Sequence, residues 1–260
     1  MADEGEAVEL RFLPPGTPRD RVVALLRDGS LEPVGRLVAS SNVSLLCTVS
    51  LPVDGAGDGE PLVASCVYKP IRGERPLWDF PDGTLAAREV AAYEVSEASG
   101  WGLVPPTLLR DGPYGEGMVQ LWLDVDEAAD PLELVRGADP RLRRHALFDV
   151  VVNNADRTVG HLLPTADGAI RAVDHGVCFH AEPKLRTVLW AWRGSPIDDG
   201  ERADLEALRS ALDGPLGTTL AGLLDADEVA ATAARLDELL VAGTFPEPDP
   251  ERRAIPWPWY

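Results

Sequence analysis

Two segments carry the chemistry of this chain: NNADRTVGH at residues 153–161 and AVDHG at residues 172–176. The first follows a stretch with helical periodicity, and the second ends a short run in which apolar residues alternate. Each segment therefore places an acidic side chain, Asp156 or Asp174, at the end of a regular element. Two carboxylates in such positions can hold a divalent metal and a reacting hydroxyl group together.

Phosphoryl transfer suits this arrangement. It needs a carboxylate that orients the acceptor hydroxyl, and it needs ligands on a magnesium ion that bridges the phosphates. Asp156 suits the first role, and Asp174 with His161, five residues beyond Asp156, suits the second. The alternative is structural: Asp156 and Asn154 cap a turn, and Asp174 ends a strand before Gly176.

The spacing of these residues resembles the catalytic and metal-binding loops of the phosphatidylinositol 3- and 4-kinase-like superfamily. The matching landmarks are Asp156-Arg157, a ligand position five residues after the aspartate, an apolar strand, and Asp174-His175-Gly176. The pattern is most similar to type II phosphatidylinositol 4-kinases and to bacterial kinases of the toxin–antitoxin type, and the chain resembles an actinobacterial branch of this family. One position differs from the family pattern: His161 stands where the family has Asn. Magnesium prefers oxygen ligands, so an imidazole is the poorer ligand at this position.

The resemblance implies an α+β, two-lobed protein-kinase-like fold, with a small antiparallel-sheet N-lobe and a mostly helical C-lobe. The expected division is an N-terminal extension with a short helix at 1–30, an N-lobe at 31–123, a helical C-lobe at 124–244, and a tail rich in Pro and Trp at 245–260. The N-lobe would carry the phosphate loop, the lysine strand and the hinge. ATP and Mg²⁺ are the implied cofactors.

The N-terminal third shows β patterns after one short helix, which Thr17-Pro18 predicts at residues 19–27. Strands are predicted at 34–39, 44–51 and 62–68, as a three-stranded antiparallel meander. The turn between the first two contains Ser40, Ser41 and Asn42, where a kinase fold places its phosphate-covering loop. Small polar residues there let backbone N–H groups approach the phosphates, although they also form ordinary hairpin turns.

Lys69 ends the third predicted strand and is one of only two lysines in the chain, so arginine would be the default for a surface charge. The resemblance implies that its ammonium group reaches the α- and β-phosphates. A helix predicted at 85–99 ends before Gly100 and carries Glu89, the expected partner of Lys69. Glu94 is the rival, and a solvated acidic helix face is the alternative for either glutamate.

The hinge between the lobes is expected after a strand at 117–123. In this fold the hinge backbone binds adenine and apolar side chains enclose it, so Gln120, Leu121 and Trp122 are candidates for the base pocket. A core position is the alternative for Trp122.

Asp139-Pro140 predicts the start of a helix that delivers the 153–161 loop on a rigid element. Arg157 either acts near the catalytic carboxylate and the transferred phosphate or forms a structural salt bridge. Further helices are predicted at 202–212, 216–224 and 227–242. The tail either packs back as an extended strap or binds a partner.

The charge of the chain limits its partners. It has 43 acidic and 24 basic residues and a net charge of −19, which argues against nucleic acid and against adsorption to an anionic membrane. A protein or small-molecule acceptor is therefore favoured, although a local basic patch would still allow a membrane lipid. No signal pattern or membrane-spanning apolar run is apparent, so no transmembrane segment is expected and the expected location is the cytoplasm.

Two functions remain open from the sequence. The first is a kinase that transfers the γ-phosphate of a bound nucleotide to an unidentified hydroxyl group. The second is a catalytically weak or inactive pseudokinase that senses nucleotides or binds protein, which His161 in place of Asn favours.

Overall fold

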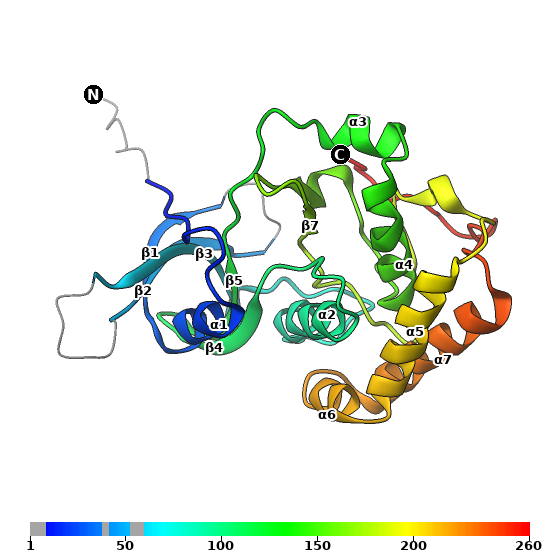
Figure 1. Ribbon diagram of the computed structural model, residues 1–260. Helices are drawn as coiled ribbons and strands as arrows, with labels where there is room; N and C mark the ends of the chain where they lie inside the picture. The colour runs from blue at the N-terminus through cyan, green and yellow to red at the C-terminus, as the bar shows by residue number, and fades with distance from the viewer. Residues whose placement is uncertain (1–8, 38–41, 53–59) are drawn as a thin grey trace. The chain divides into compact units, whose positions relative to one another are not determined.

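The computed structural model of the chain describes residues 9–37, 42–52 and 60–260. It divides into two compact units: Met1–Leu77 with Pro106–Leu123, and Trp78–Pro105 with Asp124–Tyr260. The first unit contains an antiparallel sheet and the second is mostly helical (Figure 1).

The first unit is built on a five-stranded sheet and one α-helix. Its elements are α1 Arg19–Asp28, β1 Ser30–Arg36, β2 Leu45–Leu51, β3 Leu62–Pro70, the short 3₁₀ helix η1 Ile71–Gly73, β4 Thr107–Gly112 and β5 Gly115–Leu121. The strand order is β1-β2-β3-β5-β4, and all neighbours are antiparallel. The predicted meander is therefore confirmed, and the β4–β5 hairpin extends it. The first strand begins four residues earlier than predicted, at Ser30 instead of Val34.

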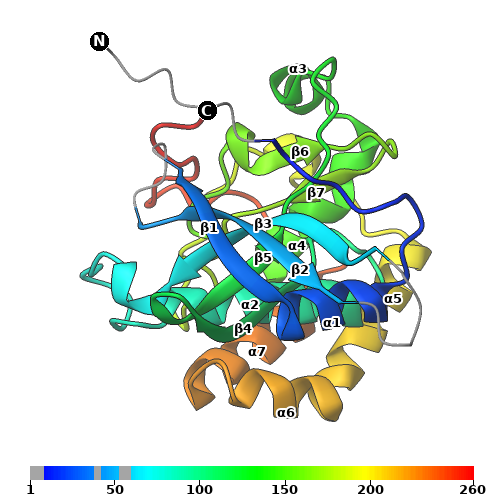
Figure 2. The same ribbon diagram turned by 90° about the vertical axis from the view of Figure 1, so that its left-hand side faces the viewer.

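One face of this sheet packs against α1. Leu25 and Leu26 of the helix are fully buried, as are Cys66 and Tyr68 on β3. Figure 2 shows α1 running beside β4. Since side chains alternate along a strand, Lys69, next to Tyr68, lies on the opposite face of the sheet.

The second unit contains the remaining helices and a small hairpin. Its elements are α2 Leu85–Ala98, α3 Pro131–Arg136, η2 Pro140–Leu142, α4 Arg143–Val151, η3 Val159–His161, β6 Leu162–Pro164, β7 Ile170–Ala172, η4 Trp190–Trp192, α5 Asp199–Leu212, α6 Pro215–Ala221 and α7 Ala226–Ala242. The helices predicted from the sequence are confirmed, with shifts of up to three residues at their ends. The predicted cap is also confirmed, because the Asp139 carboxylate accepts a hydrogen bond from the Arg141 N–H at 2.9 Å.

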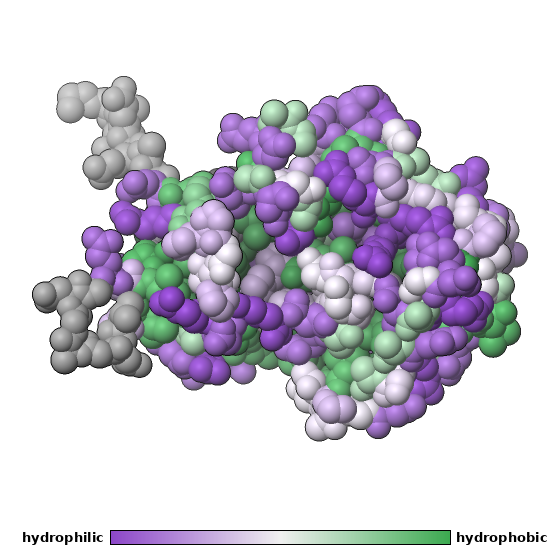
Figure 3. Space-filling model, in the orientation of Figure 1, coloured by the Kyte–Doolittle hydropathy of each residue, from purple (hydrophilic) through white to green (hydrophobic). Residues whose placement is uncertain are grey.

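Helix α2 is buried inside the helical unit. Ala91, Ala92 and Val95 belong to its main hydrophobic core, and α2 contacts α5 and α6. This packing explains why residues 78–105, which the sequence assigns to the N-lobe, group with the helical unit. Hydrophilic side chains cover much of this unit's face in Figure 3, in keeping with the acidic composition.

The tail at 245–260 packs back onto the helical unit. Phe245 is buried, the carbonyl of Ala254 accepts from the Thr187 N–H at 3.0 Å, and the carbonyl of Trp259 accepts from the Val159 N–H at 2.9 Å. The backbone thus forms the strap that was one of the two alternatives. None of the helices in the described part of the chain combines the length and the apolarity that a membrane crossing needs.

Candidate active site

Asp156 is presented by a tight turn after α4. Asn153 has a left-handed φ of 50°, and the Asn154 side-chain oxygen accepts a hydrogen bond from the Asp156 N–H at 2.9 Å. The turn-forming role therefore belongs to Asn154. Within the described residues the Asp156 carboxylate accepts no hydrogen bond, so it can accept one from a substrate hydroxyl.

The surroundings of Asp156 make it more basic. Burial of the carboxyl group raises its pKa to about 6, and the charge of Asp174 acts in the same direction. The guanidinium groups of Arg186 and Arg157 lower it. Arg186 is held at this place because its Nε donates to the Ala155 carbonyl at 2.6 Å. Asp156 is thus ionised at neutral pH yet able to take up a proton.

His161 and Asp174 lie side by side on the two loops. The Nε2 atom of His161 is 3.5 Å from Oδ2 of Asp174. Asp174 has a left-handed φ of 62°, and its side chain is 53% exposed. Residues in this backbone region are strained unless the surroundings hold them, and such strain is often found at functional sites. The pair is accessible to an ion.

The donor atoms fit magnesium in part. Magnesium is usually held by one or two carboxylates, together with phosphates and water, and the exposed Asp174 can supply such a ligand. His161 fits less well, because its Nδ1 faces the Thr158 N–H at 3.5 Å, which leaves Nε2 as the protonated nitrogen of the neutral ring. In the part of the chain that the structure describes, no group of three His, Cys, Asp or Glu residues could hold a metal.

A buried polar network lies beneath these groups. Asp149 and Arg157 are fully buried, with their charged atoms 3.1 Å apart, and Thr187 donates to the second Asp149 oxygen at 2.9 Å. Arg157 also donates to the Val173 carbonyl at 3.0 Å and to Nε2 of His175 at 2.7 Å. Of the alternatives for Arg157, the structure supports the structural salt bridge. The network joins the two loops that carry Asp156 and Asp174.

Asp149 and Thr187 were missed in the sequence. Thr187 has no signal there, because it follows the loop by almost thirty residues. Asp149 could have been identified from the sequence, because a charged residue within the apolar run Leu147 to Val152 is expected to have a buried partner.

Glu89 contacts the second loop directly. Its Oε2 accepts from the His175 N–H at 2.8 Å, and the residue is 2% exposed. Glu94, its rival, is half-buried. The structure therefore brings Glu89, Asp174 and His161 together. Whether Glu89 pairs with Lys69 stays a prediction, because Lys69 belongs to the other unit.

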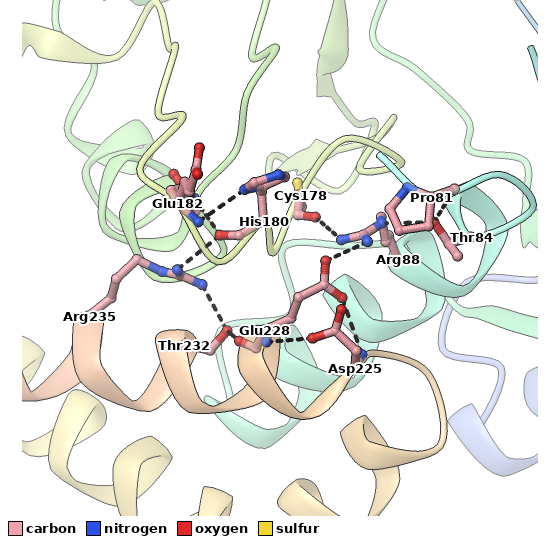
Figure 4. A network of polar contacts seen from close by, with 11 residues as sticks. Pro81, Thr84, Arg88, Cys178, His180, Glu182, Asp225, Glu228, Thr232 and Arg235 are labelled. Atoms are coloured by element: carbon pink, nitrogen blue, oxygen red, sulfur yellow. Dashed lines mark hydrogen bonds and ion pairs between the residues drawn. The ribbon is translucent and has the colours of Figure 1, made fainter. Parts of the chain in front are cut away.

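Arg88, next to Glu89, fixes α2 in the helical unit (Figure 4). Its Nη2 contacts Oε1 of Glu228 on α7 at 2.5 Å, and its Nη1 donates to the Cys178 carbonyl at 2.7 Å. The guanidinium lies 4.9 Å from the centre of the Phe80 ring. Both members of the ion pair are buried, so the rotation of α2 about its axis, and with it the direction of Glu89, is set by these contacts.

The candidates of the sheet unit lie on neighbouring strands. Lys69 on β3 is opposite Met118 of β5, and Gln120 lies on the same face of the sheet. The Gln120 side chain is buried and donates to Thr107 Oγ1 at 2.9 Å, so it is used within the sheet.

The predicted hinge residues follow at the end of β5. The N–H groups of Leu121 and Trp122 donate to the carbonyls of Pro106 and Ser65, each at 3.0 Å. Base binding by these residues would therefore use their carbonyl oxygens and side chains.

Of the three candidates in the predicted phosphate loop, only Asn42 lies in the described part of the chain. Asn42 accepts a hydrogen bond from the Arg75 N–H at 2.8 Å through its side-chain oxygen. Ser40 and Ser41 lie outside the described residues.

Comparison with known proteins places the chain in a family. Protein Rv2133c of Mycobacterium tuberculosis is 44% identical over 277 aligned positions, which cover 93% of this chain and 96% of the relative. The chain belongs to the Rv2133c family. No family model matches this member of the Rv2133c family.

Solved structures show the fold of this Rv2133c relative. The Helicobacter pylori proinflammatory kinase CtkA is similar with a TM-score of 0.50 and 11% identity, over 85% of this chain and 94% of CtkA. The Golgi casein kinase has a TM-score of 0.46 and 15% identity, over 86% of this chain and 74% of its own. The likeness to CtkA, with the small antiparallel sheet and the helical unit, confirms the predicted α+β kinase-like fold.

Proposed function

We propose that this Rv2133c relative is a kinase-like phosphotransferase that uses ATP and magnesium to phosphorylate a hydroxyl group. The observation that carries the proposal is the arrangement of Asp156, His161 and Asp174 on two loops joined by a buried network, within a kinase-like fold. Asp156 is accessible and basic, whereas the residues that hold it are buried.

Asp156 would accept the proton of the acceptor hydroxyl as its oxygen attacks the γ-phosphorus. The new bond forms between these atoms as the bond from the γ-phosphorus to the bridging oxygen breaks, and ADP leaves. A carboxylate with a pKa of about 6 is a better proton acceptor than one at the usual 3.8 and is still mostly ionised at neutral pH.

Asp174 would hold the magnesium ion, with His161 as the predicted second ligand. When bound, this ion neutralises the phosphate charge that develops during transfer. Glu89 would act from the other side of the second loop, where its carboxylate fixes the His175 N–H. Lys69 would supply the ammonium group for the α- and β-phosphates, and Glu89 would be its partner. Asn42, Gln120, Leu121 and Trp122 remain candidates for nucleotide binding.

The proposal includes the finer assignment to the phosphatidylinositol 3- and 4-kinase-like group, which rests on the spacing of the loops. The acceptor does not follow from the fold, because one fold supports many substrates. The net charge of −19 favours a protein or a small molecule over a lipid in an anionic membrane.

The second candidate is a pseudokinase, and the contacts of His161 favour it. With Nδ1 facing the Thr158 N–H, the ring presents a proton, not a lone pair, toward Asp174. Such a histidine orients Asp174 and does not itself bind metal. A site with a single carboxylate ligand would load magnesium weakly.

A thermal-shift titration with ATP, with and without magnesium, tests nucleotide binding. A ligand that binds only the folded state raises its melting temperature, so ATP with magnesium should stabilise the wild type. The variant Asp174→Ala should lose the magnesium-dependent part of this shift. No stabilisation of the wild type under any of these conditions would contradict both candidate functions.

Transfer of radiolabelled γ-phosphate, to the chain itself or to added acceptors, separates the two candidates. The kinase predicts magnesium-dependent label transfer that Asp156→Asn abolishes, whereas the pseudokinase predicts nucleotide binding without transfer. The variant His161→Asn supplies an oxygen ligand and should lower the magnesium concentration needed for half-maximal stabilisation by ATP. An unchanged magnesium requirement would show that His161 does not limit metal binding.

A further inference from the structure

The tail at residues 245–260 reaches the candidate active site through its backbone. The carbonyl of Trp259 accepts a hydrogen bond from the Val159 N–H at 2.9 Å. Val159 lies between Asp156 and His161 in the sequence, within the first of the two loops that form the site. The tail is therefore bonded directly to the loop that carries both of these candidate residues.

A second attachment joins the tail to the segment at residues 183–190. The Ala254 carbonyl accepts hydrogen bonds from the Thr187 N–H at 3.0 Å and from the indole N–H of Trp190 at 2.9 Å. A carbonyl oxygen has two lone pairs, so both are in use at this position. The tail is thus held at two places, one at Ala254 and one near its end.

The segment at residues 183–190 is in turn paired with the first loop. The Arg157 N–H donates to the Arg186 carbonyl at 3.0 Å, and the Arg157 carbonyl accepts from the Val188 N–H at 3.2 Å, as in a parallel β-bridge. The first loop, this segment and the tail are therefore joined in a ring of backbone hydrogen bonds. The Trp259 carbonyl closes the ring.

The Val159 N–H needs a partner from outside its own element. Val159 begins the 3₁₀ helix η3, and the first N–H groups of a helix have no acceptor within it. The residue is buried, with 6% of its surface exposed, so water is a poor substitute. A buried N–H without an acceptor costs about as much free energy as a lost hydrogen bond. The Trp259 carbonyl supplies the acceptor and so fixes the start of η3.

Helix η3 connects the two loops of the site. Its last residue, His161, has Nε2 3.5 Å from Oδ2 of Asp174. The His161 carbonyl also accepts from the Val173 N–H at 3.0 Å, and Val173 precedes Asp174 in the chain. Since η3 is a single turn, a shift of its first residue also moves its last. The position of His161 relative to the second loop therefore depends on what holds Val159.

We propose that the tail is a positioning element of the candidate active site, and that the hydrogen bond from the Val159 N–H to the Trp259 carbonyl holds His161 against Asp174. Trp259 is the positioning residue and acts through its backbone. This inference rests on the proposed function, in which the pair serves magnesium. It adds that a segment far along the chain from both loops is needed for tight magnesium binding.

The variant Val159→Pro removes the N–H donor from this hydrogen bond. Proline is favoured at the first position of a helix, where its fixed φ suits the backbone. It also restricts the preceding residue to extended conformations, and Thr158 is already extended, with φ −94° and ψ 168°. The variant should therefore fold. Val159→Ala is the matched control, because it removes more of the same side chain and keeps the N–H.

Native-state hydrogen exchange without nucleotide tests the positioning step. The Val173 amide is the probe, because it donates to the His161 carbonyl. Its exchange should be roughly threefold to tenfold faster in Val159→Pro than in Val159→Ala, the range expected for the loss of one neutral hydrogen bond.

A magnesium titration of the thermal stabilisation by ATP tests the consequence for the site. The magnesium concentration for half-maximal stabilisation should rise in Val159→Pro by a similar factor, roughly threefold to tenfold. It should be unchanged in Val159→Ala. A merely structural role of this position would move the melting temperature of both variants without separating their magnesium requirements.

The outcomes distinguish this inference from the proposed function. If ATP with magnesium does not stabilise the wild type, the proposed function fails, and exchange at Val173 alone decides whether the tail positions η3. Equal exchange at Val173 in the two variants would overturn the inference. So would an equal magnesium requirement in Val159→Pro and the wild type, or an equal increase in Val159→Pro and Val159→Ala.

Discussion

Two groups of ionisable residues lie on the same pair of loops or in the helix that leads into the first loop, and they differ in almost every physical respect. Asp149, Arg157 and His175 are fully buried and bonded to one another and to the backbone. Asp156 is half-buried and Asp174 is exposed, so a substrate can approach both carboxylates. The comparison teaches that the buried group provides rigidity and the exposed group provides reactivity, so substitutions in the two should have opposite consequences.

The largest effect is expected in the buried group. Arg157→Met would leave the Asp149 carboxylate buried without its charged partner, which costs about 3–5 kcal/mol of unfolding free energy. Urea denaturation of the variant and the wild type measures this loss. Arg136→Met, in an exposed pair, is the control and should change stability by less than about 1 kcal/mol. Equal losses in both would show that the network does not stabilise the loops.

Asp156→Asn should lower activity without lowering stability, the opposite of the expected effect of Arg157→Met. Loss of the proton acceptor is expected to lower phosphoryl transfer by on the order of 10²–10⁴-fold. Because the pKa of Asp156 is raised in the folded protein, folding is less favourable once the carboxylate ionises, from about pH 4 to about pH 6. At neutral pH the uncharged amide should therefore keep or raise the melting temperature. If Asp156→Asn lost as much stability as Arg157→Met, the exposed and the buried group would not differ in their contribution to stability.

Glu228→Gln sharpens the comparison at α2. The amide can still cap α7, but it removes the charge that Arg88 faces, at an expected cost of about 1–3 kcal/mol. Glu201→Gln is the control, because Glu201 also caps a helix and binds an arginine, at 2.6 Å, although that arginine, Arg143, is only half-buried. Both variants should lose stability in urea, Glu201→Gln by the smaller amount. Only Glu228→Gln should reduce the magnesium-dependent stabilisation by ATP, since only Arg88 adjoins Glu89.

The smallest effect is the pH dependence of transfer. Asp156 must be ionised to accept a proton, so the rate should fall to half its plateau near pH 6, where its pKa lies, and about tenfold per unit below that. At pH 7 the loss should be about a tenth. A pH–rate profile that is flat down to pH 5 would exclude Asp156 as the proton acceptor.

The sequence predicted the elements better than their grouping. Alternation and turn residues were enough for β2 and β3, and caps with apolar periodicity for α5 and α7. Helix α3 was missed because six residues in an acidic segment give no apolar period. Whether α2 belongs to the sheet unit or to the helical unit depends on its packing against α5 and α6, and no local sequence pattern predicts that packing.

Much of the candidate site was also within reach of the sequence. The spacing of Asp156, His161 and Asp174 predicted that they lie on adjacent loops, whereas the choice of Glu89 over Glu94 as the partner of Lys69 stays a prediction. The buried network of Asp149, Arg157 and Thr187 could not be predicted, because its members come from distant parts of the chain. Such contacts arise only when the whole fold has formed.

The pairing of Arg88 with Glu228 has a consequence for the synthesis of the protein. The two residues are 140 positions apart, so α2 leaves the ribosome long before its partner does. At about 5–20 residues per second, Arg88 would wait roughly 7–28 s before Glu228 has even been added to the chain. During most of that interval the apolar surface of α2 also lacks its native partners α5 and α6, which makes the nascent helical unit a natural client for chaperones at the ribosome.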